Sequence, residues 1–266
     1  MELSLVIFTV LSQISIGLAV MLAVRQWAVS EGPAPSSFRI EWIVVGLTLA
    51  VAFAASLFHL GHPLGSPRTV LHLGSSWLSR EIVVMQIFGI LVIVALVALW
   101  KGSANSWTLV KITALVGLAG LAVSGMVYAP PSFPALNNGV PIIFYGLTAF
   151  ILGSAFSSYF AGQEKQPLLT QILTISLIVG LVINLILPSV WLSGGRVMQM
   201  TGAAYYGSAL FWLRLVVEFG LGLAVLGVFR KIPIWLPVLL LAGEILGRIM
   251  FFTHVVHSAV NIGNLY

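Results

Sequence analysis

The chain of 266 residues contains no cysteine and very little charge. Without cysteine it cannot form a disulfide, a thiolate zinc site or a cysteine-ligated iron–sulfur cluster of its own. Only 7% of the residues are charged, 59% are hydrophobic, and the mean hydropathy is +1.09. Because so few polar groups cannot cover a water-exposed surface, we expect a polytopic membrane protein. The net charge of +5 is spread thinly among the loops, which argues against a nucleic-acid partner.

Eight apolar runs are long enough to cross about 30 Å of hydrocarbon as helices. Helices are expected because a lipid-exposed backbone must satisfy its own hydrogen bonds. The first run begins almost at Met1 and lacks a basic start and a cleavage site, so we expect a retained helix. The connections are short, so the sequence predicts an all-α integral membrane protein, residues 1–266 forming a single bundle of eight transmembrane helices. The predicted helices are 3–24, 42–58, 82–100, 108–128, 142–161, 169–191, 207–229 and 234–257.

Tryptophans and basic residues mark the predicted membrane borders. Seven of the eight tryptophans lie at or near predicted helix ends, as in an interfacial belt: Trp27, Trp42, Trp77, Trp100, Trp107, Trp191 and Trp235. Seven basic residues flank odd-numbered connections and three flank even-numbered ones. Because cytoplasmic loops carry the excess of lysine and arginine, both termini and the 59–81 loop are predicted to face outward.

The stretch from His59 to Glu81 concentrates chemistry at that outer border. It carries six ionisable side chains: His59, His62, Arg68, His72, Arg80 and Glu81. His59 follows the second apolar run and Glu81 opens the third, so the two form an acid–base pair suited to exchanging protons with a lipid-soluble redox carrier. Each also has a structural explanation, because histidine is common at membrane interfaces and a carboxylate is favoured at a helix N-terminus.

Two further charged pairs lie inside the last two apolar runs. Arg214 with Glu218 and Glu244 with Arg248 are each spaced i, i+4, so each pair shares one helix face. Antiparallel packing would place Glu218 near the depth of Arg248 and join all four residues in one ion network, for which a structural clamp is the favoured role. The last run also has two glycines that would permit close helix approach: Gly243 and Gly247.

Several segments, in the same order along the sequence, carry a resemblance to a known family. They are VIFTVLSQ (6–13), FHLGHP (58–63), SWLSRE (76–81), the arginine of ALFWLR (Arg214), and LLLAGEILGR (239–248). In these segments the chain resembles the DmsC family, the membrane-anchor subunits of dimethyl sulfoxide reductase and related molybdenum enzyme complexes. The resemblance implies a protein of the bacterial inner membrane, in which the outward-facing termini predicted from the basic residues would be periplasmic. It also implies an iron–sulfur subunit and a molybdopterin catalytic subunit as partners, besides membrane lipid.

The resemblance also implies the chemistry of the site. Menaquinol or a similar quinol would bind and be oxidised at His59 and Glu81. Independently of the resemblance, we expect Arg214 and Glu244 to shape the wall of the quinol chamber from behind. The chain itself would hold no metal, haem or iron–sulfur cluster and would not act alone on the terminal substrate. One departure is that many relatives have a basic residue two or three places after the proline of HLGxP, whereas here the first one after Pro63 is Arg68.

Three alternatives stay open at this point. The first is a quinone-reducing anchor of the type found in sulfite-oxidising complexes. The second is a haem b carrier with His59 and either His254 or His257 as axial ligands. The third is a secondary transporter or proton channel that uses the four charged residues of the last two helices as a relay.

Overall fold

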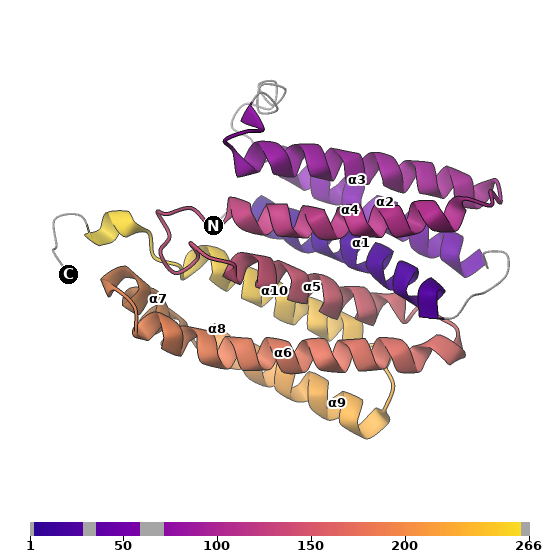
Figure 1. Cartoon of the computed structure of the whole chain (residues 1–266). Coiled ribbons are helices and arrows are strands. Elements are labelled where there is room, and N and C mark those ends of the chain that lie inside the picture. The colour runs from indigo at the N-terminus through magenta and orange to yellow at the C-terminus, as the bar shows by residue number, and fades with distance from the viewer. Residues whose placement is uncertain (1–2, 29–35, 59–71, 262–266) are drawn as a thin grey trace.

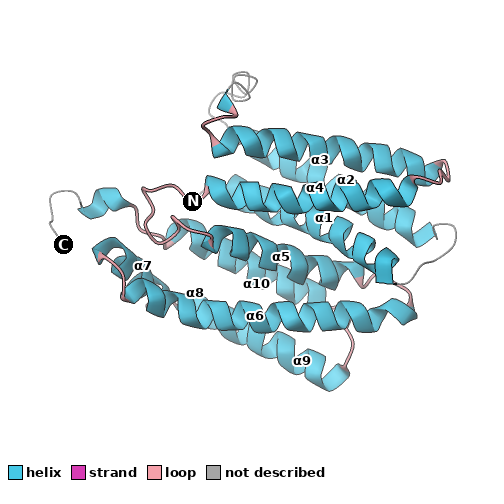
Figure 2. Ribbon diagram, in the orientation of Figure 1, coloured by secondary structure: helices cyan, strands magenta, loops and turns pink. Residues whose placement is uncertain are grey.

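The structure is a computed structural model and describes residues 3–28, 36–58 and 72–261 (Figure 1). His59 and His62 of the predicted site lie outside these residues. Throughout the described ranges the regular elements are helices (Figure 2). Eight helical segments are long and apolar enough to cross a membrane, which confirms the predicted fold class. The helices are α1 (Leu3–Ala28), α2 (Ser36–Leu57), α3 (Trp77–Trp100), α4 (Ser106–Val127), α5 (Val140–Ser157), η2 (Gln163–Lys165), α6 (Gln166–Leu192), α7 (Arg196–Tyr206), α8 (Ala209–Arg214), η3 (Leu215–Leu221), α9 (Gly222–Phe229), α10 (Leu236–Thr253) and η4 (Ser258–Asn261).

The first helix forms the centre of the bundle. It packs against α2, α4, α5 and α10. Its contact with α5 is close because glycines face each other: a Cβ added at Gly153 would lie 2.7 Å from the Cα of Gly17. Small residues at helix contacts let backbones approach closely, which is how helices pack in lipid.

The outer helices present apolar faces to the membrane. In α3, Ile90 and Ile93 are 61% and 64% exposed, and in α6 Ile186 is 56% exposed. Lipid is as apolar as these side chains, so nothing drives them into the core. The starts of α3 and α5 and the end of α10 lie at one end of the bundle, called here the Glu81 end (Figure 1).

The seventh predicted span is not one uniform helix. It consists of α8, a π-helical segment η3 and α9, and the π-helical segment begins directly after Arg214. A further short helix, α7, occupies the region that the sequence analysis treats as a connection. Hydropathy cannot distinguish α-helical from π-helical turns, since both satisfy the backbone internally. Single-turn π segments within α-helices occur frequently at functional sites.

Two of the predicted interfacial tryptophans are instead buried. Trp42 is fully buried and donates its indole N–H to the Val92 carbonyl of α3 at 2.8 Å. Trp191 is 1% exposed and donates to the Ala135 carbonyl at 3.0 Å. The belt interpretation is therefore wrong for these two, because each ring finds its hydrogen-bond acceptor inside the bundle. Trp27, by contrast, is 81% exposed at the end of α1.

Charge is also buried at the end of the bundle opposite the Glu81 end. Arg25 of α1 and Glu41 of α2 form an ion pair, and both side chains are fully buried. Ser157 of α5 donates its hydroxyl to Glu41 at 2.6 Å, and Lys165 is only 3% exposed. Arg25 and Lys165 are thus not free loop charges. Without them, five basic residues on odd-numbered connections remain against three on even-numbered ones, so the predicted orientation has weaker support.

Candidate functional site

Glu81 lies inside α3 rather than at its start. The helix begins at Trp77, and Ser76 is its N-cap, whose hydroxyl accepts the Ser79 amide at 3.3 Å. The predicted start at residue 82 is therefore too late by more than one turn. The N-cap position belongs to Ser76, so capping does not account for Glu81.

The surroundings of Glu81 are unusual for a carboxylate. The residue is 4% exposed, and Ser124 of α4 hydrogen-bonds its side chain. Its Oε1 atom has no hydrogen-bond partner among the described residues. A buried carboxylate oxygen without a donor costs free energy, so such a position is either strained or completed by another group. His59 comes two residues after the end of α2, which packs against α3.

A second polar cluster fills the space between α6, α8, η3 and α10. Arg214 is its centre. Its Nε donates to Glu218 at 2.6 Å and its Nη2 to Glu244 at 3.3 Å, while Nη1 lies 3.4 Å from the Asn184 side-chain oxygen. The guanidinium also lies over the Phe219 ring, with Cζ 5.3 Å from the centroid. Two carboxylates from different helices thus share one arginine.

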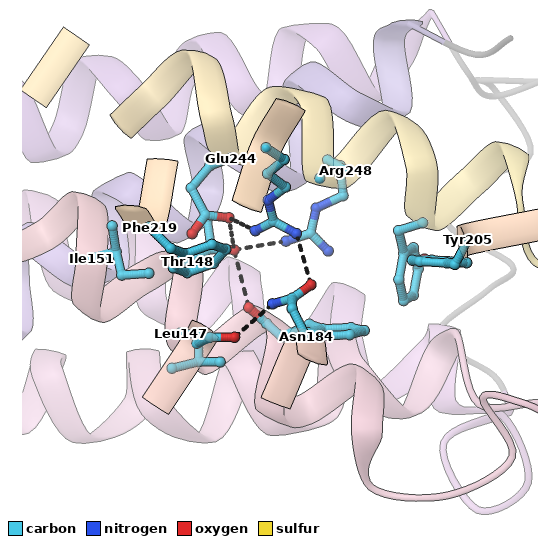
Figure 3. Close-up of a pocket in the computed structure, with 13 residues that line it drawn as sticks. Leu147, Thr148, Ile151, Asn184, Tyr205, Phe219, Glu244 and Arg248 are labelled. Atoms are coloured by element: carbon cyan, nitrogen blue, oxygen red, sulfur yellow. Dashed lines mark hydrogen bonds and ion pairs between the residues drawn. The ribbon is translucent and has the colours of Figure 1, made fainter. Parts of the chain in front are cut away.

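The fourth predicted member of the network, Arg248, joins it indirectly. Its Nη2 donates to Gln13 of α1 at 2.6 Å and to the Thr148 hydroxyl of α5 at 3.2 Å. Thr148 in turn donates to Glu244 at 2.8 Å, so a threonine stands between Glu244 and Arg248 (Figure 3). The cluster therefore extends from the π-helical segment to the central helix.

The two glycines of α10 make room for charged side chains. A Cβ at Gly243 would lie 2.6 Å from the Glu218 Cβ, and a Cβ at Gly247 would overlap the Arg214 guanidinium. This register differs from the predicted one, in which Glu218 is level with Arg248. The π-helical segment and the glycines together let α8 and η3 lie close to α10 with the Arg214 and Glu218 side chains between them.

The cluster borders a narrow pocket with room for about one water molecule. Its polar wall is formed by Arg214, Glu244, Arg248, Thr148, Asn184 and Tyr205 (Figure 3). Arg248 Nε and Nη1 and the Oε1 atoms of Glu218 and Glu244 have no hydrogen-bond partner within the described ranges. Buried atoms of this kind beside a polar cavity are commonly satisfied by water. Tyr205 comes from α7, outside the eight spans, and burial raises the pKa of its hydroxyl, which stays protonated at neutral pH.

Tyr145 of α5 connects Glu81 with the pocket. Arg248 Cζ lies 4.1 Å from the centroid of the Tyr145 ring, and the Tyr145 hydroxyl interacts electrostatically with Glu81. Tyr145 is 1% exposed. Glu81 itself lines neither this pocket nor the smaller one between α1, α4 and α5.

The described histidines are scattered near the Glu81 end. His72 is exposed, His254 follows the last residue of α10 and contacts the Thr253 hydroxyl at 2.8 Å, and His257 packs edge-on against Phe133. In the part of the protein that the structure describes, no three histidine, aspartate or glutamate side chains group as metal ligands do.

The uncharged polar residues of the cluster and around Glu81 were not predicted from the sequence. These residues are polar positions inside apolar runs, which in membrane helices signal interior contacts. That signal was present at each of them: Gln13, Ser124, Tyr145, Thr148 and Asn184. It was overlooked because threonine, serine and tyrosine are tolerated in membrane helices in many other contexts.

Residues 1–254 match the family model of the DMSO reductase anchor subunit, DmsC. The chain belongs to this family. Two relatives belong to anaerobic dimethyl sulfoxide reductases: the C subunit of the Haemophilus influenzae enzyme, 31% identical over 170 residues, and YnfH of Escherichia coli, 25% identical over 272 residues. The first alignment covers 62% of this chain and 60% of the Haemophilus protein, and the second covers 94% of both. Family and fold together make this protein a multi-pass membrane anchor of a reductase complex.

Proposed function

We propose that this DmsC-family anchor oxidises menaquinol or a similar quinol at Glu81 and His59 and passes the electrons to an iron–sulfur subunit. That subunit would supply a molybdopterin catalytic subunit in the bacterial inner membrane, with both termini of the anchor periplasmic. The observation that carries the proposal is the Glu81 carboxylate, which is 4% exposed and has one oxygen without a partner among the described residues.

A quinol hydroxyl fits this carboxylate chemically. The Glu81 carboxylate accepts a hydrogen bond from Ser124, and its Oε1 atom, which has no partner among the described residues, would accept from the substrate. A proton acceptor shielded from water exchanges its proton with the substrate rather than idly with solvent. One turn before Glu81 in α3, the apolar side chains of Trp77 and Leu78 are 40% and 47% exposed. A lipid-soluble quinol ring could approach the site along them.

The reaction balances with two acceptors. The quinol loses two electrons and two protons and becomes the quinone; Glu81 takes one proton, the neutral imidazole of His59 takes the other, and both electrons leave to the partner's nearest cluster. The reverse sequence would reduce quinone with the same residues. Arg214 and Glu244 would shape the quinol chamber indirectly. They form the polar wall of the pocket that also contains Arg248, whose guanidinium lies over the Tyr145 ring.

The test is the rate at which an added naphthoquinol reduces the iron–sulfur clusters of the purified complex, followed by electron paramagnetic resonance. In Glu81→Gln the side chain keeps its shape but is a much weaker proton acceptor, so we expect at least a hundredfold slower reduction, in the range lost with a general base. Dithionite, which reduces the clusters without the quinol site, should give the same cluster signal as in the unchanged protein.

Glu164→Gln is the matched control, because Glu164 is exposed in the α5–α6 connection and the chemical change is identical. It should leave the rate unchanged. A Glu81→Gln complex that quinol reduces at the unchanged rate would show that Glu81 does not accept the proton, and the proposed site would be abandoned.

A further inference from the structure

Tyr145 occupies the position between the proposed quinol site and the interior polar cluster. Its side chain is 1% exposed, its hydroxyl interacts electrostatically with Glu81, and its ring lies under the Arg248 guanidinium at 4.1 Å. The rings of Tyr128 and Phe251 lie 5.7 and 6.1 Å from it, and the Tyr145 hydroxyl also interacts with the Tyr128 side chain. The ring is therefore confined on several sides.

Arg248 is held in place more firmly than its contact with the ring requires. It is 3% exposed, and its Nη2 bonds to both Gln13 and Thr148. These bonds come from two other helices, α1 and α5, so the Nη2 end of the guanidinium is held in place relative to the bundle. A guanidinium over a tyrosine face attracts the ring, and the attraction is stronger when both groups are desolvated. A buried arginine fixed against one tyrosine ring suggests that the orientation of that ring matters.

We propose that the Tyr145 hydroxyl is a substrate-binding group of the quinol site and that Arg248 is a positioning residue acting through the Tyr145 ring. The proposal rests on the function proposed above. One quinol oxygen would donate its proton to Glu81 while accepting a hydrogen bond from Tyr145.

The hydrogen bond from Tyr145 serves the product as well as the substrate. When the two electrons have left and Glu81 holds the proton, the same oxygen is a carbonyl, which can only accept. Tyr145 continues to donate to it and is itself neither oxidised nor deprotonated. Preorganised donors aimed at an oxygen on which charge develops stabilise the transition state.

The decisive variant is Tyr145→Phe, which keeps the ring under Arg248 and removes only the hydroxyl. We expect the KM for menadiol, measured by cluster reduction in the intact complex, to rise about tenfold, the equivalent of one hydrogen bond. A folding defect lowers the amount of active complex and hence the apparent kcat, but it leaves KM unchanged. The KM thus separates binding from a structural role.

The control for the tyrosine is Tyr159→Phe. The Tyr159 hydroxyl donates to the Ile234 carbonyl at 2.5 Å at the opposite end of the bundle, and this variant should keep KM unchanged. Arg248→Gln should raise KM because the ring is no longer fixed, and Arg248→Lys should raise it less because a cation remains over the ring. Arg39→Gln, an exposed arginine at the start of α2, is the corresponding control.

The outcomes distinguish this inference from the function on which it rests. If Glu81→Gln slows cluster reduction while Tyr145→Phe leaves KM unchanged, the role of Tyr145 is refuted and the quinol site stands. If Arg248→Gln lowers kcat alone, Arg248 is structural and its positioning role is refuted. Unchanged rates in Glu81→Gln would remove the site and the inference together.

Discussion

Removing Glu41 should destabilise this protein more than removing its ion-pair partner Arg25. Both side chains are fully buried, and Glu41 also accepts the Ser157 hydroxyl at 2.6 Å. Leaving one member of a buried pair without the other costs about 3–5 kcal/mol. Glu41→Leu and Arg25→Met remove the two members separately, with apolar side chains of suitable size.

The structure predicts the asymmetry between the two variants. Lys165, 3% exposed, is attracted electrostatically to Glu41 as well. Glu41→Leu therefore leaves two buried cations near each other, and we expect a loss of about 5 kcal/mol, the upper end of the range. Arg25→Met leaves Glu41 with Ser157 and Lys165, and we expect a loss of about 3 kcal/mol.

The double variant Arg25→Met/Glu41→Leu isolates the cost of the orphaned charge. Replacing a whole buried pair by apolar residues is often neutral, but Lys165 would still lack the carboxylate that attracts it. We therefore expect the double variant to lose about 3 kcal/mol, which makes it more stable than Glu41→Leu by about 2 kcal/mol. The measurement is the free energy of unfolding from SDS titrations in mixed micelles, followed by circular dichroism, with exposed Glu164→Leu as the control. Additive losses, with the double variant as unstable as both single variants combined, would refute this account of the pair.

Two further substitutions test packing and the polar cluster in the same unfolding assay. Gly153→Ala should cost about 1–3 kcal/mol because its Cβ would lie 2.6 Å from the Gly17 carbonyl carbon. Gly146→Ala on the same helix is the control and should cost nothing, since a Cβ there meets nothing within 4 Å. Equal losses in the two variants would contradict the close contact between α1 and α5. Thr148→Val keeps the side-chain volume but removes the hydroxyl that joins Glu244 to Arg248. We expect it to lower the free energy of unfolding by about 1–3 kcal/mol. An unchanged free energy of unfolding would show that water replaces the threonine hydroxyl.

The polar interior was only partly predictable. The i, i+4 spacings identified Arg214 with Glu218, which the structure shows as an ion pair at 2.6 Å, since this contact depends on one helix alone. The link from Glu244 to Arg248 runs through Thr148, a residue 96 positions away from Glu244 in the sequence, and no local pattern contains it. Gln13 and Arg248 are 235 positions apart and meet only because α1 and α10 pack together.

The assignment of charges to loops failed for the same reason. Arg25 lies at the end of an apolar run. The sequence alone is compatible with two roles for it, a basic residue that flanks a cytoplasmic loop or one member of a buried ion pair. The choice depends on Glu41 of the next helix reaching it, which the structure shows. Trp42 was misassigned in the same way, because its acceptor, the Val92 carbonyl, lies on another helix.

The sequence by itself determined the number of membrane spans and their approximate limits, because the transfer of apolar side chains into lipid depends on composition and length alone. Composition equally excluded a cysteine-ligated cofactor. Only the tertiary structure decided which buried polar groups meet: the cluster around Arg214, the position of Tyr145 between Arg248 and Glu81, and the π-helical turn after Arg214. These depend on the rotation and depth of each helix relative to its neighbours, which are set by close packing of small residues and by the need to pair each buried charge.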